Sequence, residues 1–217
     1  TYFELLDLAG LFGEKGQHQA DIIFFNNNGE QFHRKSIELN GLCRQILNIS
    51  KLLSELNKLP SNYGTFCIFH KEIPNSVLKL QSFIAERGYI SYQYKNAPLR
   101  SYVHGNLDAI DDSLTLLGGS SFFNRQYNLQ YLLMPDKNYE VALINASSTN
   151  KEIKFKIVEF DNNFQIKEVI TLKPKQVFVF PIQNLSNPSR LIIESKMIMA
   201  RPGVFCFGDD KMDVFHG

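Results

Sequence analysis

The sequence has few of the features that usually disclose a function. It contains three cysteines among 217 residues, and none of them stands at CxxC spacing, which excludes the common zinc-ribbon pattern. It contains no run of about 18 apolar residues, which argues against a membrane-spanning helix. Its formal net charge is only +1, so no overall field attracts nucleic acid or an anionic membrane. We therefore expect neither of those partners.

The cysteines also bear on the compartment. Cys43, Cys67 and Cys206 lie in apolar, strand-like text, which favours small buried side chains in a reducing environment. We accordingly expect a cytoplasmic protein with no metal site and no cofactor. The first residues, Thr1 to Glu4, show neither an initiator methionine nor the basic-then-apolar pattern of a signal peptide. This start indicates a processed chain or a fragment of a longer protein.

Short strand-like segments dominate the chain. They are rich in β-branched and aromatic residues and are bounded by Asn, Ser, Asp or Pro. Residues 151–158 alternate apolar and polar, which places Ile153, Phe155 and Ile157 on one face of a strand. Short segments of turn-forming residues recur about every ten residues, a spacing typical of β-sandwiches and β-barrels. The sequence thus predicts an all-β protein.

Two parts of the chain look like copies of one module. Tyr102 to Gly105 and Val214 to Gly217 both end in His-Gly, and each follows an aromatic strand that begins near an Arg and a Gly. Upstream of these endings, residues 23–28 resemble 158–163, and residues 37–41 resemble 170–174. Further along, residues 46–49 fall opposite residues 179–182. The identity is low, so chance similarity between two β-rich halves is the alternative explanation.

The duplication predicts two tandem β-sandwich modules that pack together, with one or two short helices. We place the first module at residues 1–105, an inter-module segment at 106–137 and the second module at 138–217. A helix is expected over 49–59 with Ser50 as its N-cap. A strand is expected over 129–133, and the phenylalanines at 122 and 123 are expected to pack between the modules.

The repeated endings supply the first candidate site residues. His104 and His216 stand at equivalent positions, with Arg87 and Arg201 before the preceding strand in each copy. An imidazole and a guanidinium at a strand end could hold a polar ligand such as a sugar. The alternative is structural, since a His-Gly pair can end a strand with the histidine bonded to a turn carbonyl.

The densest combination of arginine and aromatic residues supplies the other candidates. It runs from Arg87 to Tyr102 and includes Tyr92 and Arg100. Alternate members would share one face of a strand pair, and exposed tyrosines with arginines bind sugar rings or form protein interfaces. The alternative is that half of them point into the core. We take His104, Arg87, Arg100, Tyr92, His216 and Arg201 as ligand-binding candidates. His18, His33 and His70 show no partner in the sequence, and no catalytic residue is assigned.

The second module also resembles a known family. Residues 139–146, 153–160, 172–181 and 191–200 follow the strand order of the bacterial sensory rhodopsin transducer family, with a strand ending in Asn-Ala and a later turn marked by proline. The resemblance covers about 80 residues. It implies a small β-sandwich that associates with copies of itself and binds partners or small ligands without catalysis. The family pattern has no doubling and no His-Gly endings.

These observations favour a non-catalytic binding or assembly protein, with a carbohydrate as the expected small ligand and a homo-oligomer as the expected state. The alternative is an enzyme or accessory factor that acts on sugars or glycans in bacterial polysaccharide metabolism. It would use His104 as an acid or base beside a carboxylate such as Asp108, with Arg100 or Arg87 holding the substrate.

Overall fold

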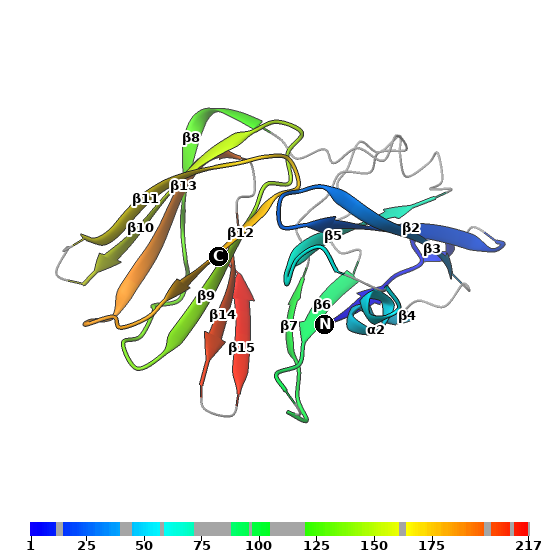
Figure 1. Cartoon of the computed structure of the whole chain (residues 1–217), viewed down its shortest axis with the longest axis horizontal. Coiled ribbons are helices and arrows are strands. Elements are labelled where there is room, and N and C mark those ends of the chain that lie inside the picture. The colour runs from blue at the N-terminus through cyan, green and yellow to red at the C-terminus, as the bar shows by residue number, and fades with distance from the viewer. Residues whose placement is uncertain are drawn as a thin grey trace.

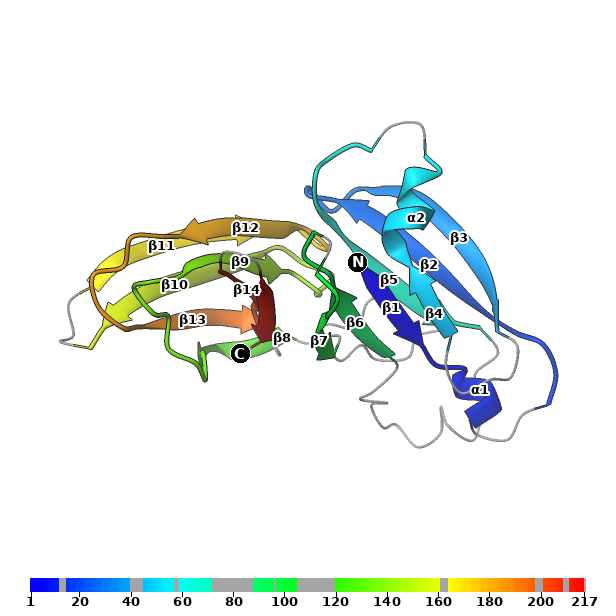
Figure 2. The same cartoon turned by 90° about the horizontal axis from the view of Figure 1, so that it is seen from below.

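The computed structural model describes residues 1–11, 15–39, 45–56, 59–71, 88–95, 97–104, 120–160, 164–197, 201–208 and 211–216. Within these ranges the chain consists of antiparallel strands and two short helices, α1 (Leu8–Leu11) and α2 (Ile49–Ser54). The predicted all-β class is confirmed. No helix in the described ranges is long and apolar enough to cross a membrane. Figures 1 and 2 show the N-terminal and C-terminal groups of sheets lying side by side.

The strands are numbered along the chain. Those of the first half are β1 (Tyr2–Leu5), β2 (His18–Asn26), β3 (Gln31–Leu39), β4 (Gln45–Asn48), β5 (Gly64–His70), β6 (Gly88–Tyr92) and β7 (Ser101–His104). Those of the second half are β8 (Ser120–Asn128), β9 (Asn138–Ile144), β10 (Lys151–Glu159), β11 (Phe164–Leu172), β12 (Val177–Ile182), β13 (Ser189–Met197), β14 (Gly203–Phe207) and β15 (Met212–His216).

The first half holds two sheets that share a buried core. Their strand orders are β4-β1-β6-β7 and β3-β2-β5. Since side chains alternate between the faces of a strand, every second residue of β1 and β2 turns inward. Phe3 and Leu5 from the first sheet thereby meet Ile22 and Phe24 from the second in a single buried cluster. The opposite face of the β4-β1-β6-β7 sheet therefore points away from this core.

The second half also holds two sheets that share a buried cluster, which is larger than that of the first half. Its sheets have the orders β12-β9-β14-β15 and β11-β10-β13-β8. Ile153, Phe155 and Ile157 of β10 are at most 1% exposed and pack with Val141 of β9 and Val204 of β14. The face predicted from the alternation in residues 151–158 is confirmed.

Strand pairing recurs between the halves at an offset of eight. In the first half β1 pairs with β4 and β6, β6 with β7, and β2 with β3 and β5. In the second half β9 pairs with β12 and β14, β14 with β15, and β10 with β11 and β13. Of the described strands, β8 alone stands outside this scheme, since it extends the second half by pairing with β13.

The described residues of the two halves meet along two lines of contact. At one, the hydroxyl of Ser101 at the start of β7 donates to the carbonyl of Met212 at the start of β15, over 2.9 Å. These two edge strands lie next to each other in Figure 1. At the other, the hydroxyl of Thr65 at the start of β5 donates to the carbonyl of Lys175 in the turn before β12, over 3.2 Å.

Gly29 makes this second line of contact close. It lies in the β2–β3 hairpin, where its N–H donates to the carbonyl of Asn26 and its φ is +81°. A Cβ at this position would lie 2.3 Å from the carbonyl oxygen of Pro174 in the other half. Both the left-handed backbone and the approach of the second half therefore require glycine here.

The helix near residue 50 is shorter than expected and is capped by a different residue. Helix α2 ends at Ser54 instead of continuing to Leu59. Its N-cap is Asn48 instead of Ser50, because Asn48 has an extended backbone and its side-chain oxygen accepts the N–H of Lys51 at 2.9 Å. The predicted cap residue instead forms part of the first turn.

The strand expected over residues 129–133 is also wrong. The strand of this segment is β8, which ends at Asn128. Beyond it, the described pairing of residues 129–133 is an isolated bridge between Leu133 and Ser189. Residues 129–133 are largely apolar because two of their leucines are buried, although the segment is not a strand: Leu129 and Leu133 are 7% and 0% exposed.

The phenylalanines of β8 do not pack between the halves, which contradicts the prediction. Phe122 and Phe123 are 93% and 81% exposed. The register explains this exposure: Arg125 pairs with Ser195 and Ser120 pairs with Met197, so a step of five residues on β8 matches a step of two on β13. The extra residues bulge out of the ladder and carry both rings with them.

Candidate functional site

The outer face of the β4-β1-β6-β7 sheet gathers aromatic and polar side chains. Tyr2 on β1 lies opposite Ser91 on β6, and Ser91 lies opposite Tyr102 on β7. Tyr89 precedes Ser91 by two residues and so shares its face. Because the alternate residues of β1 enter the core, this row faces outward. We call Tyr2, Tyr89, Ser91, Arg100 and Tyr102 the tyrosine face.

Arg100 lies across this face. Its guanidinium carbon is 3.6 Å from the centroid of the Tyr2 ring. Arg100 directly precedes β7, and β6 lies between β7 and β1, so the side chain crosses over β6 to reach the ring. Among the described residues, no carboxylate forms an ion pair with Arg100.

The middle of the row holds a buried hydroxyl. Ser91 is 0% exposed, and its Oγ has no hydrogen-bond partner among the described residues. Its neighbours on either side differ in exposure, since Tyr2 is half-buried beneath Arg100 whereas Tyr102 is 52% exposed. The face therefore offers one open aromatic ring beside a stacked guanidinium.

Tyr92 lies on the other side of this sheet. Its ring contacts the ring of Phe205 edge-on, with the centroids 4.9 Å apart, and the ring of Tyr94 contacts Phe207 at 6.0 Å. Burial raises the pKa of Tyr92 to about 12. Phe205 and Phe207 belong to the second half, so these two tyrosines join the halves. The structure does not bring Tyr92 onto the tyrosine face.

The predicted histidines occupy matching register positions. His104 ends β7 opposite Tyr89, and His216 ends β15 opposite Gly203. The side chain of His104 and the whole of Arg87 lie outside the described residues, as does Asp108. Arg201 precedes β14 and is half-buried. Of the six predicted binding residues, Arg100 is therefore the one that the described structure shows in contact with a ring of the tyrosine face.

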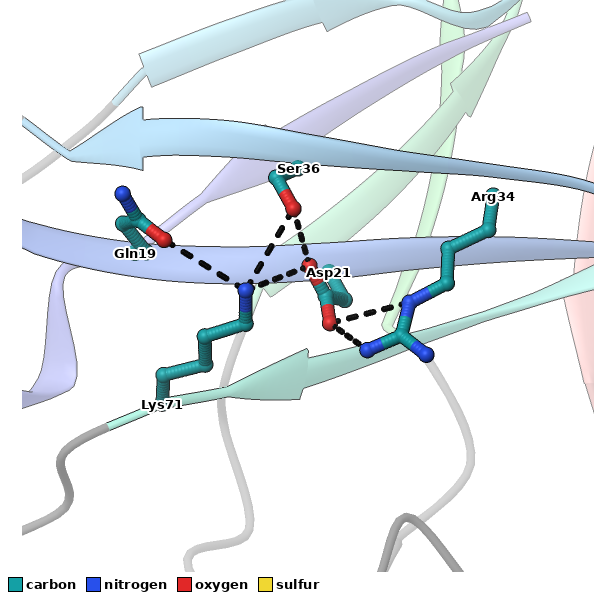
Figure 3. A network of polar contacts seen from close by, with 5 residues as sticks. All are labelled: Gln19, Asp21, Arg34, Ser36 and Lys71. Atoms are coloured by element: carbon teal, nitrogen blue, oxygen red, sulfur yellow. Dashed lines mark hydrogen bonds and ion pairs between the residues drawn. The ribbon is translucent and has the colours of Figure 1, made fainter.

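A second cluster surrounds a buried carboxylate on the β3-β2-β5 sheet (Figure 3). Asp21 of β2 is 0% exposed. Its Oδ1 accepts the hydroxyl of Ser36 at 2.6 Å and faces the Lys71 ammonium at 3.0 Å. Its Oδ2 accepts Nε of Arg34 at 3.1 Å and also contacts Nη2 of that residue. Burial raises the pKa of Asp21, but the hydrogen bonds from Ser36, Arg34 and Lys71 together outweigh it and hold the pKa below its usual range.

The donors of this cluster are already used. The Lys71 ammonium reaches Asp21, the hydroxyl of Ser36 at 3.3 Å and the amide oxygen of Gln19 at 3.4 Å, which occupies its three N–H groups. Arg34 and the side-chain amide of Gln19 keep free N–H groups. Because the carboxylate and the ammonium at the centre are fully engaged, the role of the cluster is to stabilise the sheet. A signal for this cluster is visible in the sequence, since Asp21 is the single acidic residue of the otherwise largely apolar strand β2.

A further buried pair was missed by the sequence reasoning. Nδ1 of His18 lies 3.0 Å from both carboxylate oxygens of Asp7, and the two residues are 5% and 3% exposed. The expectation that His18 has no partner is therefore wrong. Asp7 also accepts the N–H of Gly10 at 3.0 Å, so it ties the start of β2 to helix α1. Within the described ranges, no group of three or more His, Cys, Asp or Glu side chains could hold a metal ion.

Comparisons with known proteins leave the function open. No protein family matches this chain, and no curated protein matches it. A solved structure described as the crystal structure of Thermotoga maritima 1070 is similar to part of it, with 9% identity and a TM-score of 0.33. That similarity covers 45% of this chain and 91% of the other. At this score it carries no argument about fold or function.

Proposed function

We propose that this chain is a non-catalytic binding protein and that its tyrosine face holds a carbohydrate. The observation that carries the proposal is the open ring of Tyr102 beside the stack of Arg100 on Tyr2. A tyrosine ring packs against the C–H face of a sugar, and its hydroxyl bonds to the sugar hydroxyls. The guanidinium adds donors at the edge of the same surface.

The two-module architecture belongs to the same proposal. We infer that the chain consists of two tandem β-sandwich modules derived from one ancestral unit, at residues 1–105 and 138–217. The recurrence of strand pairing supports this inference. The registers support it as well, since Phe3 lies between Leu47 and Ile90 as Val141 lies between Phe180 and Val204. If the two modules are aligned by these registers, His104 at the end of β7 and His216 at the end of β15 are equivalent.

The remaining expectations rest on the sequence. We propose a cytoplasmic location, which agrees with the free thiol of Cys206. Self-association, as implied by the resemblance to the sensory rhodopsin transducer family, is also proposed. The enzymatic alternative depends on the imidazole of His104 and on Asp108, which lie outside the described residues. No contact of the described residues favours it.

A glycan array followed by calorimetric titration tests carbohydrate binding. The wild type is compared with Tyr102→Ala and with Tyr63→Ala as a matched control, because Tyr63 is 44% exposed and precedes β5 in the other sheet. Binding that Tyr102→Ala weakens about tenfold or more, and that Tyr63→Ala retains, agrees with the proposal. Absence of binding to every saccharide on the array would reject it.

A further inference from the structure

From the contacts of Arg100 we infer that the carbohydrate is acidic and carries a carboxylate. This inference rests on the function proposed for the same face. A guanidinium that stacks on a ring uses its flat face, and its N–H groups remain free at the edge. The 3.6 Å separation from the Tyr2 ring describes such a stack. Arg100 thus presents a donor edge held in a fixed plane.

No carboxylate of the described residues meets this donor edge. Two other cations of the first half do have carboxylate partners: Arg34 pairs with Asp21, and Lys35 pairs with Glu55 at 3.2 Å. Arg100, though half-buried, has none. A partly desolvated guanidinium gains most from a charged, bidentate acceptor, and a carboxylate matches its planar fork. A uronic acid supplies that group on a ring that can stack on Tyr102.

The other charges near the face set the direction of the ligand. Glu4 lies two residues beyond Tyr2 on β1, opposite Tyr89, and carries a negative charge. Arg100 enters from the opposite end of the row, since it lies two residues before Tyr102 whereas His104 lies two residues after it. The carboxylate of the ligand therefore lies at the Arg100 end, and the uncharged part of the sugar extends past Tyr102. His104 occupies the row of Glu4 and Tyr89.

The test compares trigalacturonic acid with its methyl ester, which keeps the rings and removes the charge. Calorimetric titration of the wild type should show that the acid binds about tenfold more tightly or better. Arg100→Gln should abolish the preference, and Arg100→Lys should keep part of it. Circular dichroism confirms that each variant is folded, and Lys35→Gln serves as a control for general loss of positive charge, since Lys35 is similarly exposed.

The outcomes separate this inference from the proposal on which it rests. Equal binding of acid and ester would overturn the acidic ligand and leave carbohydrate binding standing. A preference that survives in Arg100→Gln would overturn the role of Arg100. Failure of both compounds to bind, together with an empty glycan array, would overturn the inference and the proposed function together.

Discussion

Replacement of Asp21 by asparagine should destabilise the protein strongly without changing the shape of the side chain. Asp21 is fully buried and receives Ser36, Arg34 and Lys71 on its two oxygens. Removing one partner of a buried ion pair costs about 3 to 5 kcal/mol. The lower end applies here, because the side chains of Arg34 and Lys71 are 45% and 34% exposed and can turn toward water.

A loss of about 3 kcal/mol corresponds to a fall in Tm of about 6 to 12 °C for a chain of this size. Urea denaturation at pH 7, with far-ultraviolet circular dichroism, measures the free energy of unfolding directly. Glu55→Gln is the control, since its pair with Lys35 is exposed on both sides and should contribute less than about 1 kcal/mol. If Asp21→Asn proves as stable as Glu55→Gln, the argument that the network holds the sheet is refuted.

Further outcomes are expected elsewhere. The folded-state pKa of Asp21 lies below its ordinary 3.8. The contribution of Asp21 to the free energy of unfolding is therefore complete above that pH and is lost as the pH falls toward the lowered value. In Asp21→Asn, the free energy of unfolding should accordingly depend less on pH in the acid range, which denaturation at a series of pH values measures. Ser91→Ala removes a buried hydroxyl without a hydrogen-bond partner among the described residues and should leave the free energy of unfolding unchanged or raise it by up to about 1 kcal/mol. A clear fall in the free energy of unfolding, measured by urea denaturation, would show that this hydroxyl has a partner. Phe155→Ala should cost about 3 to 5 kcal/mol in the same assay. Serine at both Phe122 and Phe123 should reduce binding of a hydrophobic dye while Tm stays constant, because both rings are exposed.

The alternation of apolar and polar residues predicted most of the fold from the sequence. The alternation in β10 placed Ile153, Phe155 and Ile157 correctly because one face of that strand is fully buried. The same rule explains why only alternate aromatic residues between 87 and 102 reach the tyrosine face. The sequence alone does not show which of the two sets of alternate residues faces outward, because that depends on the second half, against which Tyr92 packs.

The errors arose where tertiary contacts override local preference. Asn48 and Ser50 are both good N-caps, and the extended backbone of Asn48 decided between them. The phenylalanines of β8 were expected inside because they are apolar, but a register shift against β13 pushed them out. The partners of Asp21 and His18 lie 11 to 50 residues away in the chain, so spacing rules for local motifs do not reveal them.

Hydroxyl-radical footprinting with mass spectrometry tests the role of the tyrosine face most directly. The protein is oxidised with and without a saturating saccharide that calorimetry has shown to bind. Protection confined to Tyr102 and Tyr2, with Tyr63 and Phe122 oxidised as before, is the predicted result. Unchanged oxidation of Tyr102 in the presence of bound saccharide, or protection centred on another surface, would contradict the account.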